Sequence, residues 1–230
     1  MNKTVKIIVE IVLFLACIFL VWCIYNSIMQ PVRFNKEQEA RTAVAVQRLK
    51  DIRTLQVAYK GETGKFTSTI DSLKNFYNDG KMTIVMQIGS ADDSVAVAHT
   101  DAIKKANKKI TAQQLFDLYK AGDKNLVFSI ESKIPVKDSL FNGRADFCID
   151  SLNFIPFSGG ELVEMEAETR TVSGVQVPLF EARMPFKKLL KGMDNQLRIN
   201  LDAERREQNK YEGLQVGSIT TPNNNAGNWE

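Results

Sequence analysis

An apolar run near the N-terminus constrains this chain more than any other feature. Between Ile7 and Met29 nearly every residue is apolar, and Glu10 is the only charged one. A helix of this length is about 34 Å long at 1.5 Å per residue, and the hydrocarbon core of a bilayer is about 30 Å thick. We therefore expect residues 1–31 to form a transmembrane anchor.

The same run does not have the pattern of a cleaved signal peptide. Such a peptide has a shorter apolar region followed by small residues at its cleavage site, whereas residues 22–31 read WCIYNSIMQP. Lys3 and Lys6 lie on one side of the run and Arg33 on the other, so the charges alone leave its orientation open. Because the N-terminal flank is short, we expect it in the cytoplasm, with an anchor in the inner (cytoplasmic) membrane. The rest of the chain would then lie in the periplasm or outside.

Glu10 has two interpretations. In the first, Glu10 is interfacial and pairs with Lys6, which precedes it by one helical turn, so that both lie near the lipid headgroups. In the second, Glu10 lies within the membrane and pairs with a group of a neighbouring subunit, because an unpaired charge there is costly. Both interpretations make Glu10 a candidate for membrane assembly.

Residues 32–62 are expected to form an amphipathic stalk helix. Pro31 interrupts or kinks the helix where it leaves the membrane, and Asn35 is a suitable N-cap for the run that follows. If the kink is mild, the anchor and the stalk form one continuous rod. The apolar positions recur every three or four residues and predict one packing face: Ala45, Leu49, Ile52, Leu55 and Tyr59.

Residues 63–219 are expected to form an α+β globular head. Helical patterns occupy 68–80 and 111–122, and alternating patterns predict strands at 81–89 and 125–137. We expect residues 93–99 to form a further strand.

From about residue 144 the pattern is all β. It predicts strands over 145–160 and a hairpin near Gly174, followed by a strand that starts at Leu197. The polar residues 220–230 predict a disordered tail. The expected fold class is therefore α+β, with a single N-terminal transmembrane helix that continues into a long amphipathic helix packed on an antiparallel sheet.

The sequence contains no recognisable catalytic motif. GxSxG, P-loop, GxGxxG and HExxH patterns are missing. His99 is the only histidine and Cys148 the only cysteine outside the apolar run, so we expect no zinc site, no other metal and no cofactor. We interpret His99 as an exposed residue at a strand end. The net charge of +3 comes without basic clusters, which excludes a typical nucleic-acid-binding protein.

Four glutamates in the second half of the chain form a candidate site. Paired carboxylates can perform acid–base chemistry or bind calcium. Three of the four alternate with Met165, Ala167 and Thr169, which is typical of the solvated face of a half-buried strand, and we favour that interpretation. The four are Glu161, Glu164, Glu166 and Glu168.

Residues 5–73 resemble the N-terminal region of type IV pilins and type II secretion pseudopilins. The resemblance implies a helical stalk with an antiparallel sheet packed on its amphipathic half, and assembly into a filament. It covers about a third of the chain and rests on Glu10 near the start of the apolar helix, on Pro31 and on the series Leu49, Ile52, Gln56, Tyr59, Gly64, Phe66, Ile70 and Leu73.

The chain departs from that family at the processing site. No glycine precedes Glu10, so the prepilin peptidase site is missing and we expect the chain to remain uncut. In the family, the glutamate pairs with the terminal amine of the next subunit. An uncut chain has no such amine at this place, and Lys6 of a neighbouring copy is the candidate cation.

Together these features favour a non-enzymatic, single-pass envelope protein. We expect a pilin-like or pseudopilin-like structural subunit of a secretion, pilus-like or motility complex. Its expected partners are other membrane or envelope proteins, further copies of itself and the lipid bilayer, with no nucleic acid. The alternative is a membrane-anchored extracytoplasmic binding module that does not polymerise, and an anchored enzyme of an unrecognised type is a third interpretation.

Overall fold

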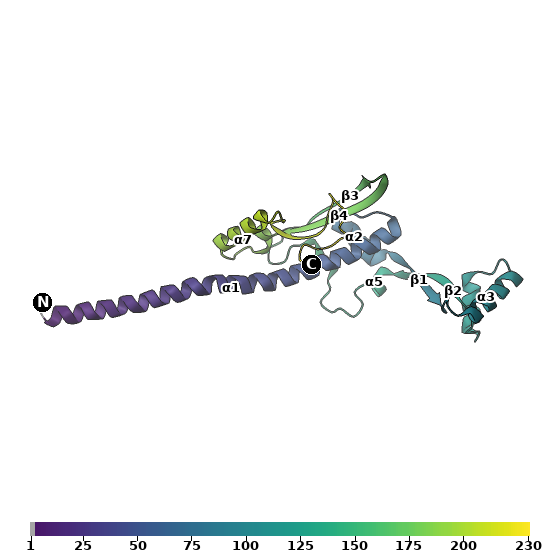
Figure 1. Ribbon diagram of the computed structural model, residues 1–230, viewed down its shortest axis with the longest axis horizontal. Coiled ribbons are helices and arrows are strands. Elements are labelled where there is room, and N and C mark those ends of the chain that lie inside the picture. Colours follow the sequence, from purple (N-terminus) through teal and green to yellow (C-terminus); the bar gives the residue numbers. More distant parts are fainter. Residues whose placement is uncertain (1–2) are drawn as a thin grey trace. The chain divides into compact units, whose positions relative to one another are not determined.

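One long helix dominates the computed structural model, which describes the backbone of residues 3–230 and the side chains of residues 7 and 10–230. Helix α1 (Lys3–Thr63) has 61 residues and passes through Pro31 without a break (Figure 1). Proline lacks an N–H, so the carbonyl of Ser27 loses its usual helical partner. The loss of one hydrogen bond does not end the helix, and of the two alternatives for Pro31 the continuous rod is found.

The chain divides into two compact units. We call Met1–Gln56, Phe66–Ile70 and Cys148–Glu230 the stalk unit, and Val57–Lys65 and Asp71–Phe147 the insert unit. Each unit has its own small antiparallel sheet. The fold is thus a mixture of helices and antiparallel sheets, as the α+β prediction requires, but a single head over 63–219 does not follow this division.

The stalk unit contains a three-stranded sheet in the order β3-β4-β5. Strands β3 (Glu164–Val172) and β4 (Val175–Pro185) form the hairpin that was predicted near Gly174. Its two turn residues, Ser173 and Gly174, have φ angles of 52° and 82°, as a two-residue turn that matches the strand twist requires. Strand β5 (Gly213–Gly217) pairs with the other edge of β4. The remaining elements are η1 (Ile149–Asn153), α6 (Phe186–Leu189) and α7 (Asn195–Glu207).

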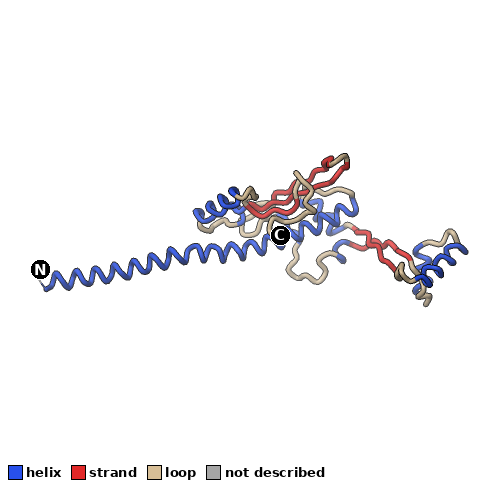
Figure 2. The backbone as a smooth tube through the Cα atoms, in the orientation of Figure 1, coloured by secondary structure: helices blue, strands red, loops and turns tan. Residues whose placement is uncertain are grey.

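Residues 34–56 of α1, which belong to the stalk unit, pack on this sheet (Figure 2). Gln56 lies against β3, with its Nε2 3.4 Å from Met165 Sδ, and the same atom donates to the Thr67 carbonyl at 2.6 Å. The Phe66 ring lies 4.7 Å from that of Phe180 on β4. Four positions of the predicted packing face have no exposed surface, namely Ala45, Leu49, Ile52 and Leu55.

Tyr59 belongs to the insert unit. It is half-buried, and its ring meets that of Phe76 edge-on at 5.4 Å. The insert unit holds a second core, formed by Leu115, Leu126, Phe128 and Ile130. Strands β1 and β2 pair antiparallel, from Lys81 opposite Pro135 to Ile88 opposite Phe128. The elements of the unit are α2 (Ile70–Asp79), β1 (Lys81–Ile88), α3 (Ser94–Ala106), α4 (Ala112–Lys120), β2 (Phe128–Pro135) and α5 (Val136–Ser139).

Two predicted strands are helices instead. Residues 93–99 lie at the start of α3, where Asp93 accepts hydrogen bonds from the N–H groups of Val95 and Ala96, both at 3.1 Å. The residues from Leu197 lie in α7, where Asp194 accepts from the N–H of Leu197 at 2.9 Å. In both cases an aspartate N-cap satisfies the first free N–H groups of a helix, and this outweighs a short run of alternating residues.

The β prediction for residues 145–160 was also wrong. This segment holds the 3₁₀ helix η1, and its one bridge joins Phe154 to Leu162. Ser158 stabilises the loop between Ile155 and Glu161. Its hydroxyl donates to the Ile155 carbonyl at 2.7 Å and accepts from the N–H of Glu161 at 3.0 Å. Such local side-chain bonds compete with a strand ladder for the backbone groups.

The C-terminal residues 220–230 are ordered, contrary to the predicted disordered tail. Gly227 forms a β-bridge with Val216. Asn228 accepts from the N–H of Gln215 at 3.1 Å and donates to the carbonyl of Gly213 at 2.9 Å. The polar composition suggested disorder. In the structure, however, the side-chain amide of Asn228 makes the hydrogen bonds to β5 that a neighbouring strand would otherwise make. Glu230 pairs with Arg53 of α1 at 2.7 Å.

We expect Asn228→Ala to lower the free energy of unfolding of the stalk unit by about 1–3 kcal/mol, because two part-buried backbone groups lose their partners. Chemical denaturation of the purified chain measures the change. Thr221→Ala removes the side chain of an exposed residue of the same segment and serves as the control. A truly disordered tail would respond equally little to both substitutions.

Candidate functional site

The N-terminal half of α1 presents a continuous apolar surface. In the part of the chain that the structure describes, this is the one helix that is long and apolar enough to cross a membrane, and none of its most apolar window is buried. Between Ile11 and Ile28 its large apolar side chains are exposed by 52–67%, with Ile18 at the low end and Phe14 at the high end. The pattern is that of a membrane anchor or of a signal sequence.

Glu10 lies on this surface, and its side chain is exposed. The side chain of Lys6 lies outside the described residues. The pairing of Glu10 with Lys6, within one chain or between neighbours, therefore stays a prediction.

The C-terminal part of the stalk unit contacts α1 at Gln30, directly after the apolar run. Gln30 Nε2 donates to Asp194 Oδ2 at 2.6 Å, and Phe34 is the first residue of α1 with a buried side chain among those described. The hydrogen bonds from the Leu197 N–H and from Gln30 lower the pKa of Asp194. The exposed apolar surface and the packed half of the helix thus meet between Met29 and Phe34.

The four glutamates that were weighed as a site are all paired with cations. Glu164 accepts from Lys188 Nζ at 2.9 Å, and Glu161 lies 3.9 Å from the same atom. Glu166 pairs with Arg183, and Glu168 pairs with Arg170 at 2.9 Å. Each carboxylate therefore has a cationic partner, and Glu161 and Glu164 share Lys188. Among the described residues, no group of three or more metal-binding side chains is found.

His99 lies on α3 and is exposed, but it is not at the end of a strand. Its Nε2 lies 2.8 Å from Asp123 Oδ2, in the loop after α4. The hydrogen bond from His99 lowers the pKa of Asp123. A carboxyl group whose pKa is lowered by folding stabilises the fold above its unfolded pKa of about 3.9, and that contribution is lost as the pH falls through the folded pKa.

We therefore expect Asp123→Asn to flatten the loss of stability of the insert unit between about pH 5 and pH 2. Hydrogen exchange of the α3 amides, followed across this range, measures the change. Asp101→Asn on the exposed face of α3 is the control, because it removes the same charge without the contact to His99. If both variants keep the pH dependence of the parent chain, the contact of Asp123 with His99 does not stabilise the unit.

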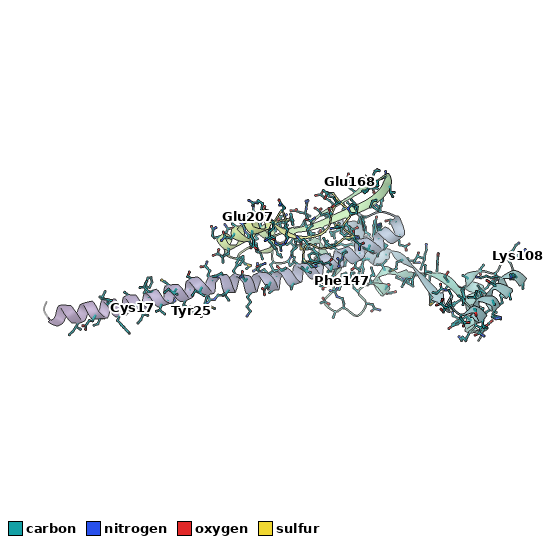
Figure 3. The ribbon with its side chains drawn as sticks, in the orientation of Figure 1. Cys17, Tyr25, Lys108, Phe147, Glu168 and Glu207 are labelled. Atoms are coloured by element: carbon teal, nitrogen blue, oxygen red, sulfur yellow. The ribbon has the colours of Figure 1, made fainter. Side chains whose placement is uncertain are left out.

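A groove of about 550 Å³ lies beside α7 in the stalk unit. In Figure 3, Glu207 marks the C-terminal end of this helix. The groove is bordered by one face of α7, by the start of α6 and by the segment that leads into β5. Its lining combines four cations, two carboxylates and an apolar wall, from Pro185, Lys187, Arg198, Ile199, Asp202, Arg206, Lys210, Tyr211 and Glu212.

Asp202 is the most unusual residue of the groove. It is only 7% exposed, and its Oδ2 accepts from Arg198 Nη1. Its Oδ1 is buried and has no hydrogen-bond partner in the described part of the chain. Desolvation by burial raises the pKa of this carboxyl group.

Glu212 and Tyr211 of the groove also have shifted pKa values. Arg206 Nε donates to Glu212 at 2.7 Å, and this bond lowers the pKa of Glu212. Burial raises the pKa of Tyr211 to about 12, so its phenol stays neutral. Sequence reasoning missed this groove because the residues from Leu197 onward were predicted to begin a strand. The signal was the spacing of Arg198, Asp202 and Arg206, which places all three on one face of a helix.

Neither a known protein family, nor a curated protein, nor a solved structure matches this chain. Its class therefore follows from the fold alone: a mixed helix-and-sheet protein with one long apolar N-terminal helix.

Proposed function

We propose that the chain is a non-enzymatic, membrane-anchored structural subunit of an envelope complex, with the arrangement of a pilin or pseudopilin. The observation that carries the proposal is the division of α1 into two halves. The first half exposes its apolar side chains, and the second half buries Ala45, Leu49, Ile52 and Leu55 against the rest of the stalk unit. A water-soluble protein rarely leaves so large an apolar surface uncovered.

The hairpin of β3 and β4 supports the pilin-like form of this proposal. In the family that residues 5–73 resemble, an antiparallel sheet packs on the amphipathic half of the N-terminal helix. Here Gln56 of α1 contacts Met165 of β3, and Phe66, in the segment that follows α1, packs against Phe180 of β4. The apolar half then remains available for lipid and for the apolar helices of neighbouring subunits.

Expression of the full chain and of a chain lacking residues 1–29 tests the proposal. We expect the full chain in the membrane fraction and, in mild detergent, in complexes larger than a monomer. The shortened chain keeps Gln30 and Phe34, so we expect it to be soluble and folded. A full chain in the soluble fraction, or one shortened at its N-terminus by cleavage, would contradict the anchor.

Glu10→Leu tests the role of the carboxylate in assembly. We expect this variant to insert into the membrane normally but to form smaller complexes, because subunits lose an ionic contact within the apolar region. Native electrophoresis in mild detergent measures the size of the complexes. Unchanged complexes would support the interfacial interpretation, in which Glu10 pairs with Lys6 of its own chain.

The groove beside α7 favours a second candidate function, a membrane-anchored binding module that does not polymerise. Its volume of about 550 Å³ lies in the range of small-molecule sites. Monomers in mild detergent, together with membrane localisation of the full chain, would favour this function over a polymerising subunit.

A further inference from the structure

The groove beside α7 has the composition of a binding site for an anion. Lys187, Arg198, Arg206 and Lys210 contribute four positive charges, and Asp202 and Glu212 contribute two negative ones. The two carboxylates already pair with Arg198 and Arg206. The lysines are exposed at the rim, where they give the groove an excess of positive charge that attracts an oxyanion.

Asp202 requires a ligand that also donates a hydrogen bond, which a simple oxyanion does not do. Its Oδ1 has less than 1 Å² of accessible surface and no hydrogen bond, which costs free energy; a ligand hydroxyl that meets it after a rotation of the Asp202 side chain removes this cost. The donor has to be neutral, because a further cation would enter a groove that already holds four. A hydroxyl group meets this condition.

An apolar wall completes the groove. Ile199, Pro185 and the neutral ring of Tyr211 border it, and small-molecule sites typically combine such a wall with a few polar groups that fix the ligand. The wall suits the C–H face of a sugar ring, whose hydroxyl groups supply the donors. The volume of about 550 Å³ accommodates one or two such rings.

We propose that this groove binds an anionic sugar, whose carboxylate or phosphate contacts Lys187 and Lys210 and whose hydroxyl group donates to Asp202 Oδ1. The ligand is either a free sugar acid or sugar phosphate, or the same unit within a longer glycan. The site does not depend on the membrane anchor, because every residue that lines it belongs to α6, α7 or the strands and segments next to them.

Calorimetric titration of the full chain in detergent micelles tests the proposal. The probes are galacturonate and galactose 6-phosphate, which carry both groups, and galactose and acetate, which carry one each. We expect at least one of the first two to bind about tenfold more tightly than either of the others. Equal binding of all four would overturn the proposal. A trimer of galacturonate distinguishes the sources: tighter binding than the monomer indicates a glycan, and equal binding indicates a free sugar.

Two substitutions locate the binding within the groove. Lys187→Glu reverses an exposed charge without disturbing the core, and we expect it to weaken binding about tenfold. Lys191→Glu makes the same change at an exposed residue outside the groove and should leave binding unchanged. Asp202→Asn replaces the charged acceptor by a neutral one, and we expect about a fivefold loss for the hydroxylated probes and none for acetate. If Lys187→Glu and Lys191→Glu have equal effects, the groove is not the site.

Discussion

A chain that carries Leu15→Arg and Phe19→Arg should no longer be retained in the membrane. Both side chains lie near the middle of the apolar half of α1, where they are exposed by 58% and 60%. An arginine at the centre of a spanning helix costs about 2.5–3.5 kcal/mol on insertion scales, so the pair costs about 5–7 kcal/mol if the two contributions add. Alkaline extraction of membranes from cells that express the variant measures the loss.

The matched control places arginines at exposed apolar positions in the other half of the same helix. Val44 and Val57 are exposed by 43% and 49%, and we expect Val44→Arg and Val57→Arg together to leave the protein in the membrane. Retention of the Leu15→Arg, Phe19→Arg chain in extracted membranes would show that the apolar half of α1 does not span the bilayer. Release of both variants would point to misfolding instead of failed insertion.

Phe180→Ala should destabilise the stalk unit by about 3–5 kcal/mol. Phe180 has no exposed surface and lies at the centre of β4, with its ring 4.7 Å from that of Phe66. The substitution leaves a cavity between the sheet and the segment that follows α1, and the surrounding strands close it only in part. Hydrogen exchange of the β4 amides reports the free energy of opening of this unit separately from the insert unit.

Val175 provides the control on the same strand. Its side chain is 62% exposed, and we expect Val175→Ala to change stability by no more than about 0.5 kcal/mol. A similarly small effect of Phe180→Ala would mean that the β3–β4 hairpin does not form the core of the stalk unit. An effect on the amides of β1 and β2 as large as that on β4 would mean that the two units do not unfold separately.

Long periodic patterns were the most reliable part of the sequence analysis. The apolar stripe over residues 45–55 repeats through three turns of α1, and its four apolar positions are fully buried. A stripe of this length fits one helical face and no strand. The hairpin near Gly174 was predictable for a different reason, because glycine tolerates the positive φ angle that the turn requires and serine is common in turns.

Short patterns misled where a capping residue decided the outcome. Alternation over residues 93–99 and from Leu197 suggested strands, yet Asp93 and Asp194 initiate helices at these two places. The division into two units was not predictable either, because it depends on which distant segments share a core. The groove beside α7 combines residues from α6, α7 and the approach to β5, and only the fold brings them together.

The absence of a break at Pro31 has a mechanical consequence. In a continuous helix, the orientation of one half about the helix axis determines the orientation of the other half. The direction in which the apolar half faces therefore fixes the direction in which the sheet on the other half lies. Each residue advances an α-helix by about 100°, and one residue more or fewer between Met29 and Phe34 would turn the stalk unit by that angle about the helix axis. The length of this short segment therefore sets which side of the sheet lies above a given side of the apolar half of α1.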